Sequence, residues 1–338
     1  MHPIQIIGTQ RSGSNLLRVM LNQLEEVVAP HPPHMLEVFF PLLEGYGNLE
    51  NDAVFFRLIE DVSRLVETNP VPWPAALPHP EEIFRRCAQR SLPEVFRQVY
   101  DALAHEVGAA TWCCKSMANV QYIREIEAAG ITPLYLHLVR DGRDAALSFQ
   151  KAIVGEKHPW QLARQWVADQ ALALEWQARL PQARFLRIHY ESLITQPEDT
   201  LRRLCAFTGL SYRPGRMLDY YHSPESVLAA AAGDMWANLD KPLLTDNHDK
   251  YRQEMRPEDL MIFECVAGEM LEKLGYAPLL PPAARIRQFS EEEIAGFERE
   301  NDARKTHARA QARPDDLAAR ARREALIREI RERKCRMG

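Results

Sequence analysis

The segment "IIGTQRSGSN", residues 6–15, constrains the fold of this 338-residue chain more than any other. It continues a short apolar run, "IQII", and leads into "SNLLRVMLNQL", whose apolar residues recur at helical spacing. Gly8 and Gly13 frame a G-x-x-x-x-G turn between the expected strand and helix. In such a turn, backbone N–H groups and the helix N-terminus converge on an anion. The segment therefore predicts a strand–loop–helix unit that binds phosphate.

The loop lacks the two side chains that hold a magnesium triphosphate. Nucleoside-triphosphate loops place Lys and then Ser or Thr after the second glycine, for the β- and γ-phosphates and for Mg²⁺. Here those positions are Ser14 and Asn15, and the positive charge lies inside the loop at Arg11. We therefore expect a phosphate-containing ligand that is bound without Mg²⁺-triphosphate chemistry.

Strand and helix patterns alternate along the rest of the chain. Further strands are expected at 110–114, 133–139 and 183–190, and helices at about 119–129, 142–152 and 160–180. This alternation predicts an α/β fold, a P-loop-type, mostly parallel sheet flanked by helices. Residues 210–256 contain several turn signals and are expected to be irregular.

The sequence predicts a catalytic domain of residues 1–282 and a tail of residues 283–338. Each contains one region that does not show the alternation of strands and helices. Residues 34–107 look helical around the Pro-rich "NPVPWPAALPHP"; they form either a cap over a substrate pocket or a rigid surface connection. The charged tail is expected to be helical. Because a sustained apolar stripe is absent, a solvated helix is favoured over a partner-binding helix or a frayed tail. A homo-oligomer formed through this helix is a further hypothesis.

Composition excludes several classes of function. A net charge of −5 argues against bulk electrostatic binding to nucleic acid or acidic membranes. The six cysteines are scattered without a C-x-x-C pair, which favours a reducing compartment. No signal sequence and no apolar run of about 20 residues is evident. We therefore expect a soluble, cytoplasmic protein.

A second motif, "LHLVRDGRDAALSF" at residues 136–149, ends one strand and opens a helix. Together with "RSGSN" it resembles the PAPS-dependent sulfotransferases, a family with a 5′-phosphosulfate loop and a strand-terminal 3′-phosphate motif. The resemblance implies that Arg140 and Ser148 bind the 3′-phosphate, and a planar guanidinium suits phosphate oxygens. Alternatively, Asp141 and Asp144 cap the helix and pair with the arginines. The resemblance assigns the 5′-phosphosulfate to Arg11, Ser12, Gly13, Ser14 and Asn15.

Three later segments extend the resemblance, which runs from about residue 4 to 276. "CCKSMANV" places Lys115 25 residues before Arg140, a spacing similar to that of the catalytic lysine of protein-tyrosine and related sulfotransferases. "RIHYESL" resembles a segment whose tyrosine, here Tyr190, lies near the nucleotide. "NLDKPLLTDNHDKYR" resembles a late segment whose lysines, here Lys241 and Lys250, contact the cofactor's phosphates.

The resemblance implies transfer of a sulfuryl group from PAPS to a hydroxyl or amine of a small-molecule acceptor, leaving PAP. Arg11 and Lys115 would stabilise charge on the bridging and leaving oxygens, without a metal. The alternatives are a P-loop nucleotide kinase, which would need Mg²⁺, and a non-catalytic nucleotide-binding or scaffold protein. The fold does not choose the acceptor, although the apolar segment 34–80 hints at a small or lipophilic one.

A general base is expected in "APHPPHMLEVF", which offers His31, His34 and Glu37. Histidine titrates near neutrality and suits the removal of a proton from the acceptor. The two prolines would hold both imidazoles on a restricted turn. Alternatively, His34 begins the following helix and Glu37 complements that helix's dipole. The family pattern does not decide between His31 and His34 as the base.

Overall fold

The structure is a computed structural model that describes residues 2–337, with side chains for all of these except Ala319 and residues 334–337. Its centre is a sheet of five strands in the order β2-β3-β1-β4-β5. Every pairing between neighbouring strands is parallel. The strands are β1 (Ile4–Ile7), β2 (Val27–Val28), β3 (Thr111–Cys114), β4 (Leu134–Val139) and β5 (Phe185–His189). The predicted parallel α/β fold is confirmed, and β2 is an addition too short to leave a sequence pattern.

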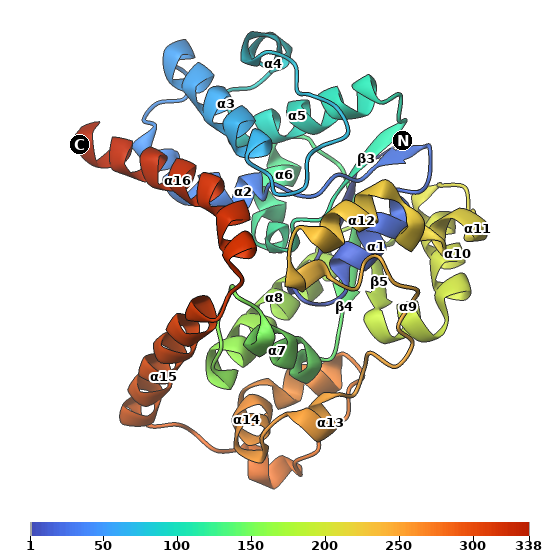
Figure 1. Ribbon diagram of the computed structural model, residues 1–338, viewed down its shortest axis with the longest axis vertical. Coiled ribbons are helices and arrows are strands. Elements are labelled where there is room, and N and C mark those ends of the chain that lie inside the picture. Colours follow the sequence, from blue (N-terminus) through green and yellow to red (C-terminus); the bar gives the residue numbers. More distant parts are fainter. Residues whose placement is uncertain (1, 338) are drawn as a thin grey trace.

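Helices cover both faces of the sheet (Figure 1). Ile6 packs into the cluster around α1, whereas its neighbour Ile7 packs into the cluster that contains Ala173 of α8, on the other face. Burial on both faces is typical of parallel strands and explains their continuous apolar runs. The covering helices are α1 (Ser14–Leu21), α6 (Ile123–Ala128), α7 (Gly142–Lys151), α8 (Pro159–Arg179), α9 (Tyr190–Thr195), α10 (Pro197–Thr208) and α14 (Pro257–Lys273).

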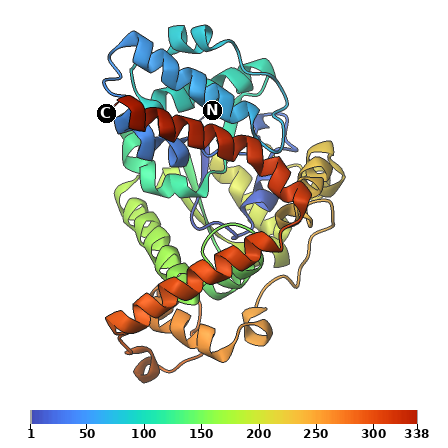
Figure 2. The same cartoon turned by 60° about the vertical axis from the view of Figure 1, so that its left-hand side comes forward.

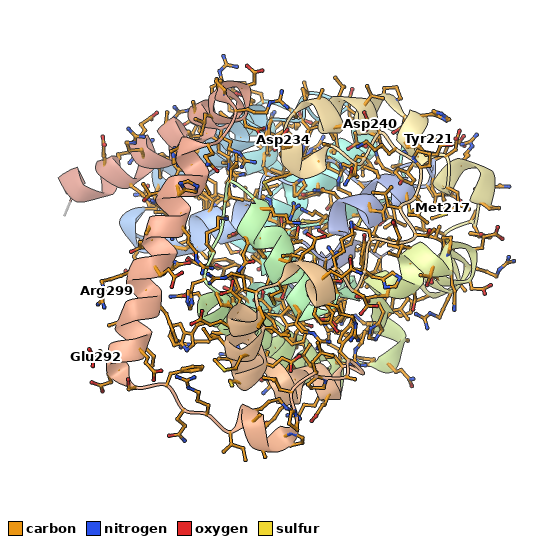
Figure 3. The ribbon with its side chains drawn as sticks, turned by 60° about the horizontal axis from the view of Figure 1, so that its bottom comes forward. Met217, Tyr221, Asp234, Asp240, Glu292 and Arg299 are labelled. Carbon is orange, nitrogen blue, oxygen red and sulfur yellow. The ribbon has the colours of Figure 1, made fainter. Side chains whose placement is uncertain are left out.

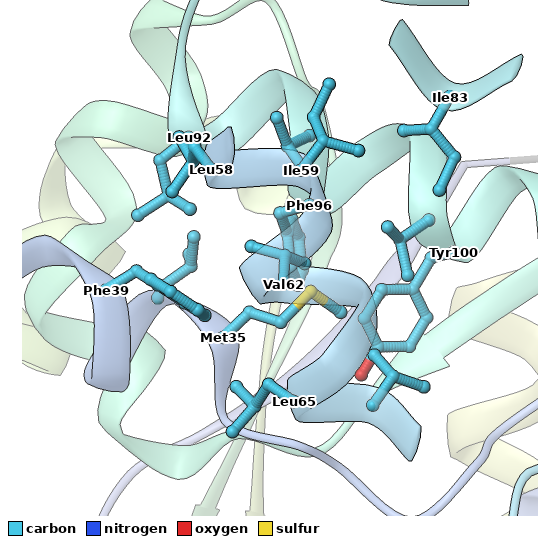
Figure 4. Close-up of a cluster of buried hydrophobic side chains, with 14 of the residues drawn as sticks. Met35, Phe39, Leu58, Ile59, Val62, Leu65, Ile83, Leu92, Phe96 and Tyr100 are labelled. Carbon is cyan, nitrogen blue, oxygen red and sulfur yellow. The ribbon is translucent and has the colours of Figure 1, made fainter. Parts of the chain in front are cut away.

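The insertion between β2 and β3 is helical, as predicted, and it has its own core. Its elements are α2 (Met35–Phe39), η1 (Phe40–Gly45), α3 (Asp52–Glu67), α4 (Pro80–Arg86) and α5 (Leu92–Glu106). Leu58, Val62 and Leu65 share one face of α3 and meet Phe96 of α5 in a buried cluster (Figure 4). We refer to residues 34–107 as the cap, because they form one wall of the cavity described below.

Short helical turns joined by loops make up residues 210–256, the segment expected to be irregular. They are α11 (Pro214–Met217), η4 (Tyr220–His222), α12 (Pro224–Ala231), η5 (Asp234–Trp236) and α13 (Tyr251–Glu254). Three further turns lie elsewhere: η2 (Met117–Tyr122), η3 (Gln182–Arg184) and η6 (Pro282–Arg285). Two of these turns reach the cavity described below: η4 with Tyr220, and η5 with Met235 and Trp236.

The tail is helical, as predicted, and forms α15 (Glu291–Ala310) and α16 (Pro314–Met337). A capping box between Ser290 and Glu293 starts α15. Figure 3 shows Glu292 and Arg299 of α15 pointing away from the body of the protein. The prediction of a solvated helix therefore holds for the outer face of α15.

For α16 the solvated interpretation is wrong. This helix turns back across the cap (Figure 2), and Leu326 and Ile330 are buried in the cap's apolar cluster. Ion pairs hold it there: Glu329 with Arg64, and Arg333 with Asp61 at 3.0 Å. The sequence concealed this docking because the inward face of α16 changes from arginine to apolar residues along its length, so no continuous stripe exists.

Two smaller predictions concern compartment and membrane. Cys87, Cys113, Cys114, Cys205 and Cys265 are free thiols, and the side chain of Cys335 lies outside the described residues. Among the helices of residues 2–337, none is both long and apolar enough to cross a membrane.

Candidate functional site

A cavity of about 680 Å³ lies at the carboxyl edge of the sheet. The loop after each of the five strands contributes a residue to its wall: Arg11 after β1, His31 after β2, Lys115 after β3, Arg140 after β4 and Tyr190 after β5. Ligands of open parallel sheets bind at this edge, where connections leave neighbouring strands in opposite directions. In this sheet the change of direction lies between β1 and β4. The parallel fold therefore explains why residues far apart in the sequence meet here.

The loop after β1 has the geometry expected of an anion-binding turn. Gly13, the N-cap of α1, has φ 81°, and a Cβ there would lie 2.3 Å from the Tyr190 ring. Only glycine fits both constraints without movement of that ring. Ser14 and Asn15, in the first turn of α1, line the cavity. Ser12 does not; it is buried, and its hydroxyl has no hydrogen-bond partner among the described residues.

Arg11 joins the two phosphate motifs. Its backbone is left-handed, with φ 67°, and its Nε donates to Ser148 Oγ at 3.0 Å across 137 residues of sequence. Burial, followed by the positive charges of Arg140 and Arg320, lowers the pKa of Arg11 to about 10. A guanidinium whose pKa is lowered in this way lacks a sufficient counter-charge among the described residues.

Arg140 is held by backbone carbonyls rather than by acids. Nη1 donates to the Arg11 carbonyl and Nη2 to the Asn247 carbonyl, each at 3.0 Å. The guanidinium lies over the Tyr190 ring at 4.5 Å, and the Tyr190 hydroxyl accepts a 2.7 Å hydrogen bond from Asn247. Nε of Arg140 is buried without a partner. The guanidinium therefore remains available to an anion.

The alternative interpretation of the second motif holds for Asp141 and Arg143 but not for Asp144. Asp141 caps α7 by accepting from the Arg143 backbone N–H and pairs with the Arg143 side chain at 2.7 Å. Asp144 instead accepts from the Tyr251 backbone N–H. Within residues 2–337, no carboxylate lies within 4.0 Å of the Arg140 guanidinium. The cap of α7 and the guanidinium without a carboxylate partner therefore come from different members of the same motif.

Lys115 is buried beside other cations. Burial, followed by the charges of Arg18 and Arg11, lowers its pKa to about 7. Lys250 lines the cavity at its rim, whereas Lys241 does not line it and donates to Asn238. Of the two lysines predicted in the late segment, Lys250 thus has the position required to contact a ligand in this cavity.

His31 is buried, and its neighbours determine its tautomer. Asn69 Nδ2 donates to the His31 carbonyl at 2.6 Å, so its Oδ1 faces the imidazole Nδ1, 3.1 Å away. Nδ1 must then carry the proton, because an amide oxygen only accepts. Nε2 is left as a lone pair with no partner among the described residues. Burial is the main cause that lowers the pKa of His31 well below its usual value.

His34 lies on the same wall in a different setting. It occupies the N-cap position of α2 with φ 60°, and its Nδ1 lies 3.1 Å from Glu37 Oε2. Burial lowers the pKa of His34, and Glu37 partly opposes this effect. His34 begins α2 and Glu37 lies in its first turn, as the alternative interpretation proposed, and both side chains also line the cavity.

Five residues of the site were not predicted. Asn69 precedes a proline in the Pro-rich segment and resembles any loop residue. Trp236 packs edge-on against the His31 ring, with centroids 4.9 Å apart. Arg18 is fully buried and pairs with Glu225. Arg320 and Arg323 reach the cavity from α16; their arginine-rich context concealed them.

The sequence matches the model of a sulfotransferase family over residues 3–214, more than half of the chain. No curated protein matches it. The sulfotransferase domain of the olefin synthase from Synechococcus PCC 7002 has a similar fold, with 19% identity and a TM-score of 0.55; the match covers 83% of this chain and 96% of that domain. The sulfotransferase domain from the curacin biosynthetic pathway matches at 20% identity and the same TM-score, covering 83% and 99%.

The family match includes the loop after β1, both histidines of the β2 loop, Lys115 and the Arg140–Ser148 motif. The two solved domains are similar to this chain in fold. On the strength of the family match, this chain belongs to the sulfotransferase family.

Proposed function

We propose that this protein transfers a sulfuryl group from PAPS to a hydroxyl or amine of a small acceptor without a metal. The observation that supports this most is the convergence of Arg11, Lys115 and Arg140 on one cavity. None of the three has a carboxylate within 4.0 Å in the described part of the chain. Uncompensated buried cations are costly, so the site fits a ligand that brings several negative charges.

The residues fit the two charged ends of this donor. The first-turn amides of α1 and Arg11 would hold the 5′-phosphosulfate. Arg140, with its unpartnered Nε, and Ser148 would hold the 3′-phosphate, and Lys250 would add charge at the rim. Tyr190, packed beneath Arg140, would keep that guanidinium in place. When bound, PAPS supplies an electrophilic sulfuryl group and a bisphosphate leaving group.

Lys115 and Arg11 would stabilise the charge that develops as the leaving group departs. Arg11 is bound to Ser148 and Lys115 is buried, so little reorganisation is required when the donor binds. The anionic donor would also raise the pKa of Lys115 and keep it protonated. That the reaction needs no metal is a prediction from the loop sequence, in which Ser14 and Asn15 replace the Lys and Ser or Thr of triphosphate loops.

His31 is the better candidate for the general base. His31 lines the cavity, its Nε2 has no hydrogen-bond partner among the described residues, and its lowered pKa keeps the ring neutral at physiological pH. His34 has a carboxylate neighbour in Glu37, which favours the protonated ring. We therefore assign the base to His31 and a supporting role in the acceptor pocket to His34.

The experiment that tests this function is calorimetric titration with PAP in EDTA, compared with ATP plus Mg²⁺. Tight binding of PAP alone supports the donor class. Preference for Mg-ATP would instead favour a nucleotide kinase and overturn the proposal. Incubation with PAPS and a panel of hydroxylated and aminated compounds, with PAP release as the readout, then separates an enzyme from a non-catalytic nucleotide-binding protein.

A further inference from the structure

Two arginines of α16 extend into the cavity from outside the part of the chain that matches the family. Arg323 follows Arg320 by three positions, a spacing that places both side chains on one face of the helix. Asp316, Leu326, Ile330 and Arg333 continue this face, and the last three dock α16 against the cap. The docked end of the helix therefore fixes where the two guanidiniums point.

The arginines at the cavity differ from other arginines nearby. Arg313 pairs with Asp234 at 2.8 Å, Arg309 with Glu324 at 2.8 Å and Arg333 with Asp61 at 3.0 Å. Among residues 2–337, no carboxylate lies within 4.0 Å of Arg320 or Arg323. Burial lowers the pKa of both. The attraction of Asp316 and Glu324 for Arg320, and of Glu37 for Arg323, only partly offsets this burial. Two partly buried guanidiniums that no carboxylate pairs directly indicate a site for an oxyanion.

Both arginines lie beside the proposed base. Arg323 Nη2 donates to the Pro33 carbonyl at 3.1 Å, on the turn that carries His31 and His34. The Arg320 guanidinium lies 5.7 Å from the Trp236 ring, and that ring contacts His31. Each guanidinium is thus one contact away from the imidazoles, on the side of the cavity that the acceptor would occupy.

The donor already has sufficient partners elsewhere. Arg11, Lys115, Arg140 and the loop amides match both of its charged ends, as argued above. We propose that Arg320 and Arg323 bind an anionic group of the acceptor, a carboxylate or a phosphate, and so direct its hydroxyl or amine toward His31. This inference rests on the proposed function and adds the class of acceptor, for which the sequence hinted only at a small or lipophilic molecule.

The fork of each guanidinium would give two charge-assisted hydrogen bonds to the oxyanion. Arg323 retains further N–H groups beyond the one bound to Pro33, and Arg320 retains a face against Trp236. An acceptor held at this end would place its remaining groups against Trp236 and Leu239, which also line the cavity. The acceptor is therefore expected to carry both an apolar part and an anion.

The first test uses the protein saturated with PAP, so that the donor site is filled. Inorganic phosphate and acetate are titrated separately by calorimetry into the wild type, Arg320→Gln, Arg323→Gln and Arg322→Gln. Arg322 is exposed on the same helix, so Arg322→Gln loses the same charge without touching the cavity. We expect at least one anion to bind the wild type and Arg322→Gln alike, and about tenfold more weakly to the other two variants.

The better-bound probe identifies the anion as carboxylate or phosphate. No binding to wild type, or equal binding to all four proteins, would overturn the proposal. PAP affinity is measured first. If the wild type does not bind PAP, the proposed function itself is rejected. If only Arg320→Gln or Arg323→Gln fails to bind PAP, these arginines belong to the donor site and not to the acceptor site.

A second test compares acceptors in matched pairs of hydroxy acid and methyl ester, with PAP release from PAPS as the readout. We expect the acid to react faster in wild type and Arg322→Gln, and the ratio of kcat/KM for acid over ester to fall about tenfold in Arg320→Gln and Arg323→Gln. Wild-type protein that prefers the ester would contradict the proposal. Unchanged thermal unfolding would confirm that the variants fold.

Discussion

The side-chain amide of Asn69 contacts His31 twice: its Nδ2 donates to the His31 carbonyl, and its Oδ1 faces the imidazole Nδ1. The amide therefore determines that Nε2 is the imidazole nitrogen without a proton. Asn69→Asp would place a carboxylate beside Nδ1–H and raise the pKa of His31. Because the base must be neutral to accept a proton, the acid limb of the kcat–pH profile should move to higher pH. Asn69→Ala should lower kcat about tenfold without that shift. A profile unchanged in Asn69→Asp would contradict the positioning role.

Substitution of His31 should remove turnover and leave donor binding intact. We expect His31→Gln to lower kcat by about 10²–10⁴-fold, the usual contribution of a general base, and PAP affinity to change by less than about twofold. His34→Gln is the matched comparison from the same turn and should have a smaller effect on kcat. A His34 variant that is the slower of the two would move the base to His34.

Binding of PAP should be accompanied by proton uptake at Lys115. In the free protein its pKa is about 7, so at pH 8 the amine is mainly neutral. The bound anion would raise that pKa toward the ordinary value, and close to one proton, about 0.9, should be taken up per PAP at pH 8. Calorimetry in buffers of different ionisation enthalpy measures this number.

Lys115→Met is the control for the proton count and should bind PAP without this uptake. Lys115→Ala should also abolish transfer, as should Arg11→Ala. Uptake that persists in Lys115→Met would mean that another group titrates, and a Lys115→Ala protein with wild-type kcat would refute the leaving-group role.

Removal of Arg140 should affect donor affinity more than chemistry. Arg140→Ala is expected to weaken PAP binding by about 10²-fold, corresponding to loss of a charged hydrogen-bonding pair. Ser148→Ala loses one neutral donor and should cost about tenfold or less. Calorimetric titration distinguishes the two. Arg143→Ala is unsuitable as a control because Arg143 is buried in a network with Asp141 and Glu264.

The docking of α16 predicts a stability effect from a residue far from the cavity. Leu326→Ala should destabilise the protein by about 2–4 kcal/mol if α16 unfolds together with the rest. If α16 instead detaches alone, limited proteolysis near residues 311–313 should become faster while the main unfolding transition stays unchanged. If Leu326→Ala lowers neither the free energy of unfolding nor the resistance of residues 311–313 to proteolysis, the packing described here is contradicted.

The sequence was most informative where local chemistry and the parallel fold coincide. Each strand longer than three residues left a strand pattern in the sequence, and the G-x-x-x-x-G frame after β1 marked the anion-binding turn. The family resemblance assigned Arg11, Lys115 and Arg140 to one donor. The parallel fold explains how they meet, because parallel strands present their carboxyl ends at one edge of the sheet. The placement of these residues around one cavity agrees with that expectation.

Features that depend on tertiary packing were not predictable. β2 has only two residues, and each pairs with a residue of β3 that lies 84 positions further along the chain. Asn69 acts on His31 through contacts that no local pattern encodes. α16 was misjudged because its inward face combines arginines for the cavity with leucine and isoleucine for the cap, and a periodicity test recognises only a face of uniform polarity.

The position of α16 after all five strands has a consequence for the order in which the enzyme becomes competent during synthesis. A ribosome-bound chain that has emerged through Lys250 would already contain every group assigned to the donor. The guanidiniums assigned to the acceptor are translated later, and they reach the cavity only when α16 folds back onto the cap. A nascent or prematurely terminated chain would thus recognise the nucleotide before it could discriminate among the molecules to be sulfated.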